Sequence, residues 1–381
     1  MLLSSKNGSR GNLMLVLSLL FLMLVPIANS LTTYTATVVI TPIQWLSGWD
    51  KRVKIAIDPA DVDSPLSDFP VLIHLSSSSG VNSDDVTFIF DELQSDVNRK
   101  KIAVTTSDKV TQCYVEIERW DTASEQAWLW AKAPNVNDAV DTILYLYYDR
   151  DHADNTDYVG DPKSTAAENV WNSDYILVWH LGEEGDVIDS TSNNNNGSVT
   201  GLTSVAGKVG YARNSSGGSN GIASTNTITL GTGQFTVEGW FNPNVYTTEW
   251  IGLFGPKDPI DDYNEIMWPY QGKWGYWDWS VEVTSNQPIV AGQWDYYVVV
   301  REGTSSDQLK NYINGLYDNA GTSTRSFPAQ PIWLGKSSTY PWNGISDELR
   351  ISNVSRSVAW IKASYESGRD NLLDFNSEEI A

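Results

Sequence analysis

Cysteine is nearly absent from the 381 residues of this chain, because Cys113 is its single example. One cysteine excludes an intrachain disulfide, so core packing must hold the fold together. Histidine is scarce as well, and His74, His152 and His180 offer little material for a histidine-rich zinc centre. Basic residues are few: 25 Lys and Arg stand against 47 Asp and Glu, giving a net charge of −22. This balance argues against nucleic acid or anionic lipid as the main partner.

Long apolar runs are also missing beyond the first thirty residues. Within residues 1–30, two basic side chains precede an apolar stretch at 13–27, which is shorter than the ~20 residues of a membrane-spanning helix. The small residues of Ala28-Asn29-Ser30 follow this stretch. The pattern predicts a signal peptide over residues 1–30, cleaved after Ser30, rather than an uncleaved anchor. We therefore expect a secreted or cell-surface protein that is not an integral membrane protein.

Short apolar runs rich in β-branched and aromatic residues fill the rest of the chain, separated by clusters of Asp, Pro, Ser and Asn. In the first half these runs cover residues 53–57, 69–75, 86–90, 113–120, 127–133 and 142–148. In the second half they cover residues 175–179, 235–241, 250–255, 294–302, 310–315, 331–335 and 348–352. Because no helical pattern separates them, they predict an all-β fold of sandwiches or jelly rolls.

Polar residues divide the β pattern into two tandem β-sandwich or jelly-roll domains. We place the first domain at residues 45–160, a linker at 161–172 and the second domain at 173–375. Residues 31–44 form an alternating, Thr-rich strand ahead of the first domain. This strand could extend a sheet of its own chain or complete the sheet of a neighbouring subunit, which would allow self-assembly into a surface filament or layer.

One short helix is predicted, close to the C-terminus. Ser355 or Ser357 can cap its start, and the apolar residues from Val358 to Tyr365 fall on one face. Gly368 is predicted to end the helix as the residue just beyond its last turn. Within the second domain, Asn314-Gly315 predicts a two-residue hairpin turn, since both residues tolerate a positive φ.

Four groups of residues in the second half follow one another in a recognisable order and spacing. They are residues 178–183 with 189–198, then 207–212, then 235–243 with 291–300 and 311–315, and finally 342–368. The pattern resembles a laminin-G-like jelly roll of the concanavalin A-like lectin/glucanase superfamily. The first half resembles an extracellular β-domain of unknown function that often precedes such jelly rolls. Together these resemblances imply a non-catalytic module that binds glycans or proteins.

Aromatic side chains concentrate between residues 268 and 279. Strand alternation places Trp274 and Tyr276 on one face and Trp277 and Trp279 on the other. Rings on both faces predict an open platform on which sugar CH faces stack while nearby polar groups bind the hydroxyls. The predicted ligand-binding residues are Trp268, Tyr270, Trp274, Tyr276, Trp277, Asp278 and Trp279. A protein-contact patch and a second small core are the alternatives.

Calcium is the predicted cofactor, with a structural role. Laminin-G-like jelly rolls often bind one calcium ion, so the resemblance implies Glu183, Asp189 and Asp347 as its ligands. The segment 189–197 carries many oxygen-bearing side chains, and the alternative is an Asx-rich turn solvated by water. A second acid-rich segment, 149–157, lacks the Gly and Glu of an EF-hand loop, and we interpret it as a solvated linker.

Catalysis has weaker support in the sequence. Hydrolases of the superfamily that resemble laminarinase use Glu-x-Asp-x-x-Glu on one strand, and no such triplet occurs here. Asp278 and Glu282 would share a strand face, but the middle acid is missing. His180 lies in an apolar strand and is interpreted as a core or hydrogen-bonded histidine, and Cys113 as a buried thiol. We therefore predict an adhesin-like protein, not an enzyme, that recognises carbohydrate or a surface glycoprotein. A filament subunit and a glycoside hydrolase are the alternatives.

Overall fold

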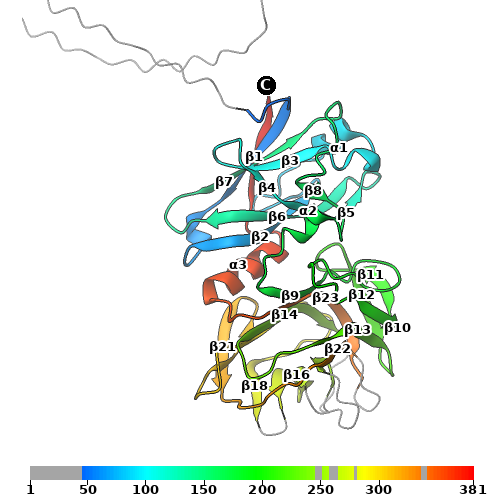
Figure 1. Cartoon of the computed structure of the whole chain (residues 1–381), viewed down its shortest axis with the longest axis vertical. Coiled ribbons are helices and arrows are strands. Elements are labelled where there is room, and N and C mark those ends of the chain that lie inside the picture. Colours follow the sequence, from blue (N-terminus) through cyan, green and yellow to red (C-terminus); the bar gives the residue numbers. More distant parts are fainter. Residues whose placement is uncertain (1–44, 245–250, 257–264, 279–280, 336–340) are drawn as a thin grey trace, which may run out of the picture.

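The computed structural model describes residues 45–244, 251–256, 265–278, 281–335 and 341–381. These residues form four β-sheets in two stacked lobes (Figure 1). Helices are short and few compared with the strands, so the predicted all-β class is confirmed. The signal peptide predicted at 1–30 and the extension strand at 31–44 lie outside the described residues.

Two sheets make up the N-terminal lobe. The first sheet has the order β24 (Asp374–Ile380), β1 (Lys51–Ile57), β7 (Thr142–Tyr148), β3 (Ile102–Thr106) and β4 (Gln112–Cys113). The second has the order β2 (Leu66–Leu75), β6 (Gln126–Val136), β5 (Val115–Asp121) and β8 (Val159–Gly160). The last strand of the chain therefore pairs with the first described strand, so residues beyond 373 complete the N-terminal lobe.

Two larger sheets make up the C-terminal lobe. One has the order β10 (Gly197–Thr200), β13 (Gly221–Ile228), β22 (Gln330–Leu334), β15 (Phe254–Pro256), β16 (Glu265–Tyr270), β17 (Lys273–Trp277) and β18 (Glu282–Pro288). The other has the order β11 (Thr203–Ala206), β12 (Tyr211–Ser216), β23 (Asn343–Ser352), β14 (Phe235–Pro243), β19 (Asp295–Arg301), β20 (Leu309–Ile313) and β21 (Leu316–Gly321). Strand β9 (Tyr175–Trp179) also pairs with β23.

Strand β19 is buried on both faces, which explains its unbroken apolar sequence. Val299 belongs to the core between the two sheets of the C-terminal lobe. Val298 and Val300 belong to a separate cluster on the other face, together with Trp240 and Ile361. A helix therefore covers the outer face of this sheet, because Ile361 lies in α3.

Helix α3 (Val358–Gly368) lies between the two lobes and contacts β2 and β21 (Figure 1). The Ser357 side chain caps it by accepting a hydrogen bond from the backbone N of Trp360, as the sequence predicts. The predicted role of Gly368 is wrong, because this glycine is the last helical residue. It is required instead by close packing: a Cβ atom there would lie 2.8 Å from Nε1 of Trp240.

Two segments differ from the predicted strands and linker. Residues 86–90 were expected to form a strand, but α1 (Phe88–Leu93) occupies most of this segment. Ile89, Phe90 and Leu93 have helical spacing, and the helix buries all three on one side, while buried Val86 precedes it. The predicted linker contains α2 (Thr165–Glu168), and its residues Ala166, Ala167, Val170 and Trp171 are buried. Two 3-10 turns complete the described helices, η1 (Pro59–Asp61) and η2 (Asp96–Asn98).

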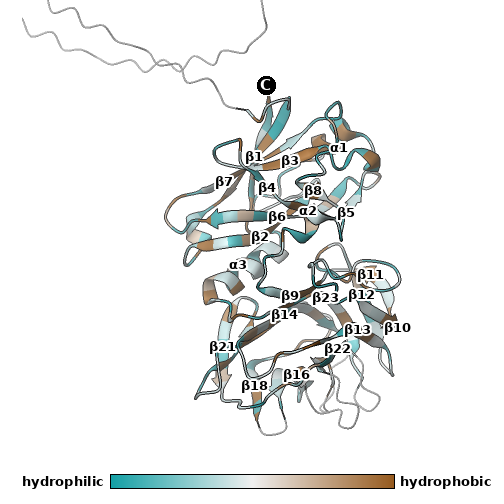
Figure 2. Cartoon of the chain, in the orientation of Figure 1, coloured by the Kyte–Doolittle hydropathy of each residue, from teal (hydrophilic) through white to brown (hydrophobic). Residues whose placement is uncertain are grey.

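A single hydrophobic cluster runs from the N-terminal lobe into the C-terminal lobe. Val71 and Leu129 of the N-terminal lobe belong to the same cluster as Val178 of β9 and Trp360 of α3. Apolar segments, drawn in brown in Figure 2, follow strands of both lobes. Cys113 is buried in this cluster, as predicted. Among the described residues, no helix has the length and apolar character that crossing a bilayer requires.

Candidate functional site

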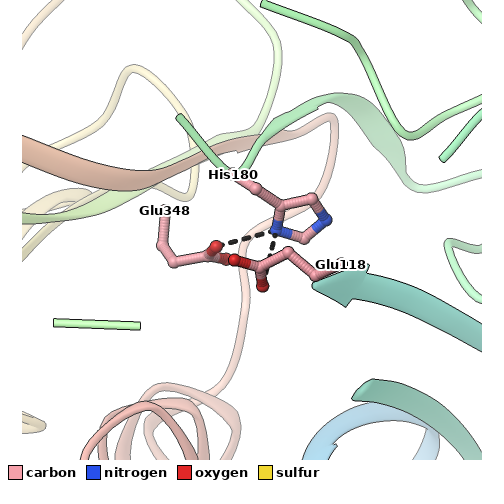
Figure 3. A group of neighbouring side chains, drawn as sticks. All are labelled: Glu118, His180 and Glu348. Carbon is pink, nitrogen blue, oxygen red and sulfur yellow. Dashed lines mark hydrogen bonds and ion pairs between the residues drawn. The ribbon is translucent and has the colours of Figure 1, made fainter. Parts of the chain in front are cut away.

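Charged side chains are buried where the two lobes meet (Figure 3). Glu118 comes from β5 of the N-terminal lobe. His180 directly follows β9, and Glu348 lies on β23 of the C-terminal lobe. Their side chains are 5%, 1% and 2% exposed. One ligating atom from each lies within 4.8 Å of the other two. We call these residues, together with Glu116 and Arg350, the junction cluster.

Both ring nitrogens of His180 face carboxylates. Nδ1 lies 2.7 Å from Oε1 of Glu348 and 3.5 Å from Oε2 of Glu118. Nε2 lies 3.3 Å from Oε2 of Glu116, which is also on β5. Carboxylates of the N-terminal lobe and of the C-terminal lobe therefore share one imidazole ring.

Neutral donors orient the two β5 carboxylates. Nε1 of Trp130 donates to Oε2 of Glu118 at 2.8 Å. Nε1 of Trp171 donates to Oε2 of Glu116 at 2.5 Å, and Oγ of Ser190 donates to its Oε1 at 2.6 Å. These bonds fix both side chains, since a buried carboxylate without partners is strongly disfavoured.

A β-bulge in β23 sets the position of Glu348. Trp240 pairs with Asp347 and Glu238 with Arg350, so two residues of β23 stand opposite the single Gly239 of β14. Glu348 has a φ of 50°, which is uncommon for a non-glycine residue within a strand. Bulges bend a strand and re-aim its side chains. Here the re-aimed carboxylate reaches His180.

Arg350 supplies the second positive charge of the junction cluster. Its Nη2 lies 2.5 Å from Oε2 of Glu348, and its Nη1 lies 3.8 Å from Oε1 of Glu238. The guanidinium also lies 4.2 Å from the centroid of the Trp130 ring. Arg350 thus places a second cation beside Glu348 and a cation near the buried Glu238, which offsets part of the cost of burying these carboxylates.

Burial and mutual charge shift the pKa values of these groups. Burial alone lowers the pKa of His180, but the charges of Glu348, Glu118 and Glu116 together raise it well above its usual value. Burial, with the charge of Glu348, raises the pKa of Glu118 to about 8. Burial opposes the charged form of Glu348 too, but His180 and Arg350 lower its pKa. Near neutral pH the cluster therefore holds an imidazolium beside the Glu348 carboxylate.

A pocket of about 290 Å³ opens beside the junction cluster. Its lining residues are Glu118, Arg119, His180, Gly182, Glu183, Glu184 and Tyr211. The guanidinium of Arg119 lies 4.0 Å from the centroid of the Tyr211 ring, which is 36% exposed. The pocket connects the edge of the junction cluster with the surface.

The aromatic residues predicted to form an open platform are buried instead. Trp274 and Tyr276 have no exposed surface and belong to the core of the C-terminal lobe. Trp268 is 2% and Trp277 is 8% exposed, while Tyr270 is half-buried. The expectation of exposure is wrong for the four most buried rings, because Trp274 and Tyr276 pack into the core of the lobe, and Trp268 and Trp277 stack on each other. Trp279 lies outside the described residues.

These rings pack on one another and on neighbouring strands. Trp274 stacks on Tyr297 of β19 with centroids 5.5 Å apart. On β16, Trp268 stacks on Tyr270 at 5.0 Å and on Trp277 at 5.3 Å. This packing corresponds to the core alternative that the sequence left open. Aromatic stacking here contributes to the stability of the lobe.

Asp278 is buried as well and has internal partners. Its Oδ2 accepts a hydrogen bond from Oη of Tyr276 at 2.8 Å and another from Oγ of Ser323. Its Oδ1 accepts one from the backbone N of Val281. The predicted pairing with Glu282 on one strand face is wrong, because β17 ends at residue 277 and β18 begins with Glu282, which is exposed.

The three predicted calcium ligands have different hydrogen-bond partners and pocket positions. Asp189 is fully buried, and its carboxylate accepts hydrogen bonds from the backbone N atoms of Val178, Thr191 and Asn195. Such backbone donors are typical of an Asx turn. Oδ2 of Asp347 accepts hydrogen bonds from the backbone N atoms of residues 208 and 209. Glu183 lines the pocket beside the junction cluster.

Within the described part of the chain, the ligand atoms that do come together are those of Glu118, His180 and Glu348. The sequence analysis identified His180 as a hydrogen-bonded core histidine but missed both glutamates. A signal was present for Glu118, because it lies among apolar residues in the predicted strand at 113–120. A charged residue in such a strand is buried only when it is paired.

A second pocket, of about 340 Å³, lies at the edge of the C-terminal lobe. Tyr317 is 53% and Leu316 is 67% exposed beside it. Both follow the Asn314-Gly315 turn, whose φ angles of 50° and 79° confirm the predicted hairpin. The other lining residues are Gln287, Pro288, Val290, Gln293, Asp295, Ile313, Asn314 and Asp318. We call this the Tyr317 pocket, and the sequence analysis did not identify it.

Comparison with solved structures gives distant similarities. Domain 4 of AbnA, a GH43 extracellular arabinanase from Geobacillus stearothermophilus solved with arabinotriose, is 22% identical with a TM-score of 0.40. The match covers 49% of this chain and 96% of that domain. The binding domain of Paraclostridial mosquitocidal protein 1 is 15% identical with a TM-score of 0.41, over 51% of this chain and 52% of that one.

Trypanosoma rangeli sialidase in complex with the inhibitor DANA is 10% identical with a TM-score of 0.44. Here the match covers 63% of this chain and 42% of the sialidase. No curated protein matches the chain. Residues 216–362 match the family model for the concanavalin A-like lectin/glucanases superfamily. Over these residues, the C-terminal half of the chain is therefore similar to the concanavalin A-like lectin/glucanase superfamily.

Proposed function

We propose that this chain is a secreted or cell-surface protein that binds carbohydrate, without catalysis, through its C-terminal lobe. The superfamily match supports a ligand-binding role for this lobe. The observation that carries the proposal is the exposed ring of Tyr317 beside a pocket of about 340 Å³. Carbohydrate sites combine such a ring, which packs on sugar CH groups, with polar groups that bind hydroxyls.

The Tyr317 pocket contains both kinds of group. Tyr312, which is buried, contacts Tyr317 edge to face with centroids 5.7 Å apart and so holds the exposed ring in place. Gln287 and Gln293 are exposed at the pocket and offer amide donors and acceptors. Asp318 accepts a hydrogen bond from the backbone N of residue 286 through Oδ2, and its Oδ1 is a further acceptor that can bind a sugar hydroxyl.

The floor of the Tyr317 pocket is already ordered. Asn314 accepts a hydrogen bond from the backbone N of Tyr296 and donates one to Oδ1 of Asp295, while Asp295 also accepts one from Nε1 of Trp274. A binding surface that is ordered before the ligand arrives loses less conformational entropy on binding. The buried aromatic residues thus support the proposed site from below.

The test is a glycan array probed with the mature chain, in three forms. Wild type should retain a defined class of glycan, and Tyr317→Ala should weaken that binding at least tenfold, or about 1.4 kcal/mol. Tyr211→Ala is the matched control, because it removes another exposed tyrosine ring from the same lobe. Equal binding by Tyr317→Ala and wild type would contradict the proposed site. Failure of wild type to retain any glycan would contradict carbohydrate binding itself.

The non-catalytic part of the proposal has a separate test. It is supported by the absence of a Glu-x-Asp-x-x-Glu triplet from the sequence and by the burial of Asp278, whose carboxylate accepts hydrogen bonds from Tyr276 and from the backbone N of Val281. Incubation with β-glucans should release no new reducing ends. Release that Glu282→Gln abolishes would establish a glycoside hydrolase instead.

Export is the remaining part of the proposal, and it is supported by the sequence pattern of residues 1–30. The mature protein purified from its host should begin at Leu31. An N-terminal sequence that still contains residues 1–30 would contradict cleavage.

A further inference from the structure

We propose that Glu118, His180 and Glu348 form a binding site for one divalent transition-metal cation, such as Zn²⁺, between the two lobes. In this proposal the cation takes the place of the proton on Nδ1 of His180. One imidazole nitrogen and two carboxylate oxygens are ligands that suit Zn²⁺ better than Ca²⁺, which prefers oxygen ligands throughout. This site differs from the calcium ligands that the sequence predicts, and it is independent of carbohydrate binding.

One distance between ligand atoms is close to that of a tetrahedral site, and a second is shorter. Ligand bonds of about 2.0 Å place neighbouring ligand atoms about 3.3 Å apart. Nδ1 of His180 lies 3.5 Å from Oε2 of Glu118, which already meets this spacing. Its 2.7 Å distance to Oε1 of Glu348 is that of a hydrogen bond. Loss of that proton would let the two atoms separate by the required ~0.6 Å and bind the cation.

The groups behind each ligand orient it in the way that metal sites require. A ligating histidine usually has its other ring nitrogen bonded to a carboxylate or carbonyl. Here Nε2 of His180 faces Oε2 of Glu116 at 3.3 Å, which leaves Nδ1 for the cation. Arg350 binds Oε2 of Glu348 at 2.5 Å, which leaves Oε1 for the cation. Trp130 donates to Glu118 at 2.8 Å and fixes its rotamer.

An independent observation is an unpartnered carboxylate oxygen next to the cluster. Asp347 is fully buried, and its Oδ1 has no hydrogen-bond partner. The charges of Glu348 and Glu118 both act on this carboxylate. The acids Glu116, Glu118, Asp347 and Glu348 outnumber the bases His180 and Arg350 at the junction. A bound cation would favour the charged forms of Glu118 and Asp347, whose pKa values are raised by burial and by the neighbouring acids.

The pocket beside the junction cluster gives a cation a route to the site. Glu118 and His180 both line it, as does Glu183, whose buried Oε2 has no hydrogen-bond partner. Gly182 and Gly210 leave space there, because Cβ atoms at these positions would lie 3.8 Å and 3.2 Å from Oε1 of Glu118. A water molecule or Glu183 could complete the coordination from this side.

The experiment uses the mature chain after treatment with a chelator and its removal. Zn²⁺, Mn²⁺ and Ca²⁺ are then titrated separately by calorimetry. We expect one Zn²⁺ ion to bind per chain, and Glu118→Gln to weaken this binding at least tenfold. The matched control is Glu184→Gln, which removes an exposed carboxylate from the same pocket and should leave Zn²⁺ binding unchanged.

A second measurement needs no variant and so does not depend on the folding of one. Because the cation displaces the proton on His180 and the proton that Glu118 holds at neutral pH, wild type should release about two protons per bound Zn²⁺ in weakly buffered solution at pH 7. Bound Co²⁺ should also give the visible absorption bands of a tetrahedral site with a nitrogen ligand. Absence of saturable Zn²⁺ binding would overturn the proposal and leave the cluster as a proton-linked ion network. Equal Zn²⁺ affinity in Glu118→Gln and wild type, or selective binding of Ca²⁺, would also overturn it.

Discussion

The aromatic residues of β16 and β17 and the junction cluster are both buried, but for different physical reasons. The aromatic group was predicted from the sequence, although as an exposed surface, whereas only His180 of the junction cluster was singled out. Trp268, Trp274 and Trp277 pack on other rings within one lobe. His180 instead meets carboxylates from both lobes. Strand alternation predicts which side chains share a face, but it does not predict what covers that face. The aromatic residues therefore stabilise one lobe, whereas the charged residues of the junction cluster connect the two lobes.

Removal of a core ring should have the largest effect on stability. Trp274→Ala deletes a fully buried indole that stacks on Tyr297, so the free energy of unfolding should fall by about 3–5 kcal/mol. Urea denaturation measures this change. Tyr317→Ala is the comparison, because its exposed ring should cost less than about 0.5 kcal/mol. A small effect of Trp274→Ala would show that this ring is not part of the core.

Loss of a buried charge partner should have the next largest effect. Arg350→Met leaves Glu348 and Glu238 buried without their guanidinium, which should lower the free energy of unfolding by about 3 kcal/mol. Lys310→Met is the matched control, since Lys310 pairs with Glu302 at the surface and should contribute at most about 1 kcal/mol. Similar losses in the two variants, measured by urea denaturation, would contradict the buried character of the junction cluster.

A partly exposed ion pair should have the smallest effect and a defined pH dependence. Burial opposes ionisation of Asp161, but hydrogen bonds from Arg99 and Lys100 lower its pKa below the usual value. A carboxyl group with a lowered pKa stabilises the fold above its unfolded-state pKa, and this stabilisation is lost as the pH falls through the folded-state pKa.

At pH 7, Asp161→Asn should therefore reduce the free energy of unfolding by about 0.5–1 kcal/mol, a value that allows for solvent screening. The difference between wild type and variant should shrink steadily below pH 4, as followed by thermal unfolding across a pH series. A difference that grows towards acidic pH would have the wrong sign for this account.

Local sequence signals predicted much of the fold. The hairpin at Asn314-Gly315 and the cap of α3 at Ser357 depend on residues close in sequence, and both are present. Helix α1 was missed although its apolar spacing was visible, because the run of β-branched and aromatic residues at 86–90 outweighed that spacing. Pairing of β24 with β1 joins the two ends of the described chain, and no local pattern specifies it.

The candidate sites were harder to predict for the same reason. His180 and Glu348 are separated by 168 residues, and Glu118 comes from the other lobe. Only the folded chain brings them together. The exposure of individual rings was also hard to predict. Trp274 and Tyr317 are both aromatic residues in short strands, but Trp274 is buried on a strand inside its sheet, whereas Tyr317 is exposed on an edge strand. Position within a sheet depends on long-range strand order, which composition and alternation do not contain.

The most direct test of the central claim, that buried charges join the two lobes, is a double-mutant cycle between them. Glu116→Gln, His180→Gln and the double variant are unfolded with urea in the presence of a chelator. Because Nε2 of His180 lies 3.3 Å from Oε2 of Glu116, we predict a coupling energy of about 1 kcal/mol or more. Losses that add to within about 0.3–0.5 kcal/mol would show that the two side chains do not interact, and would contradict the account.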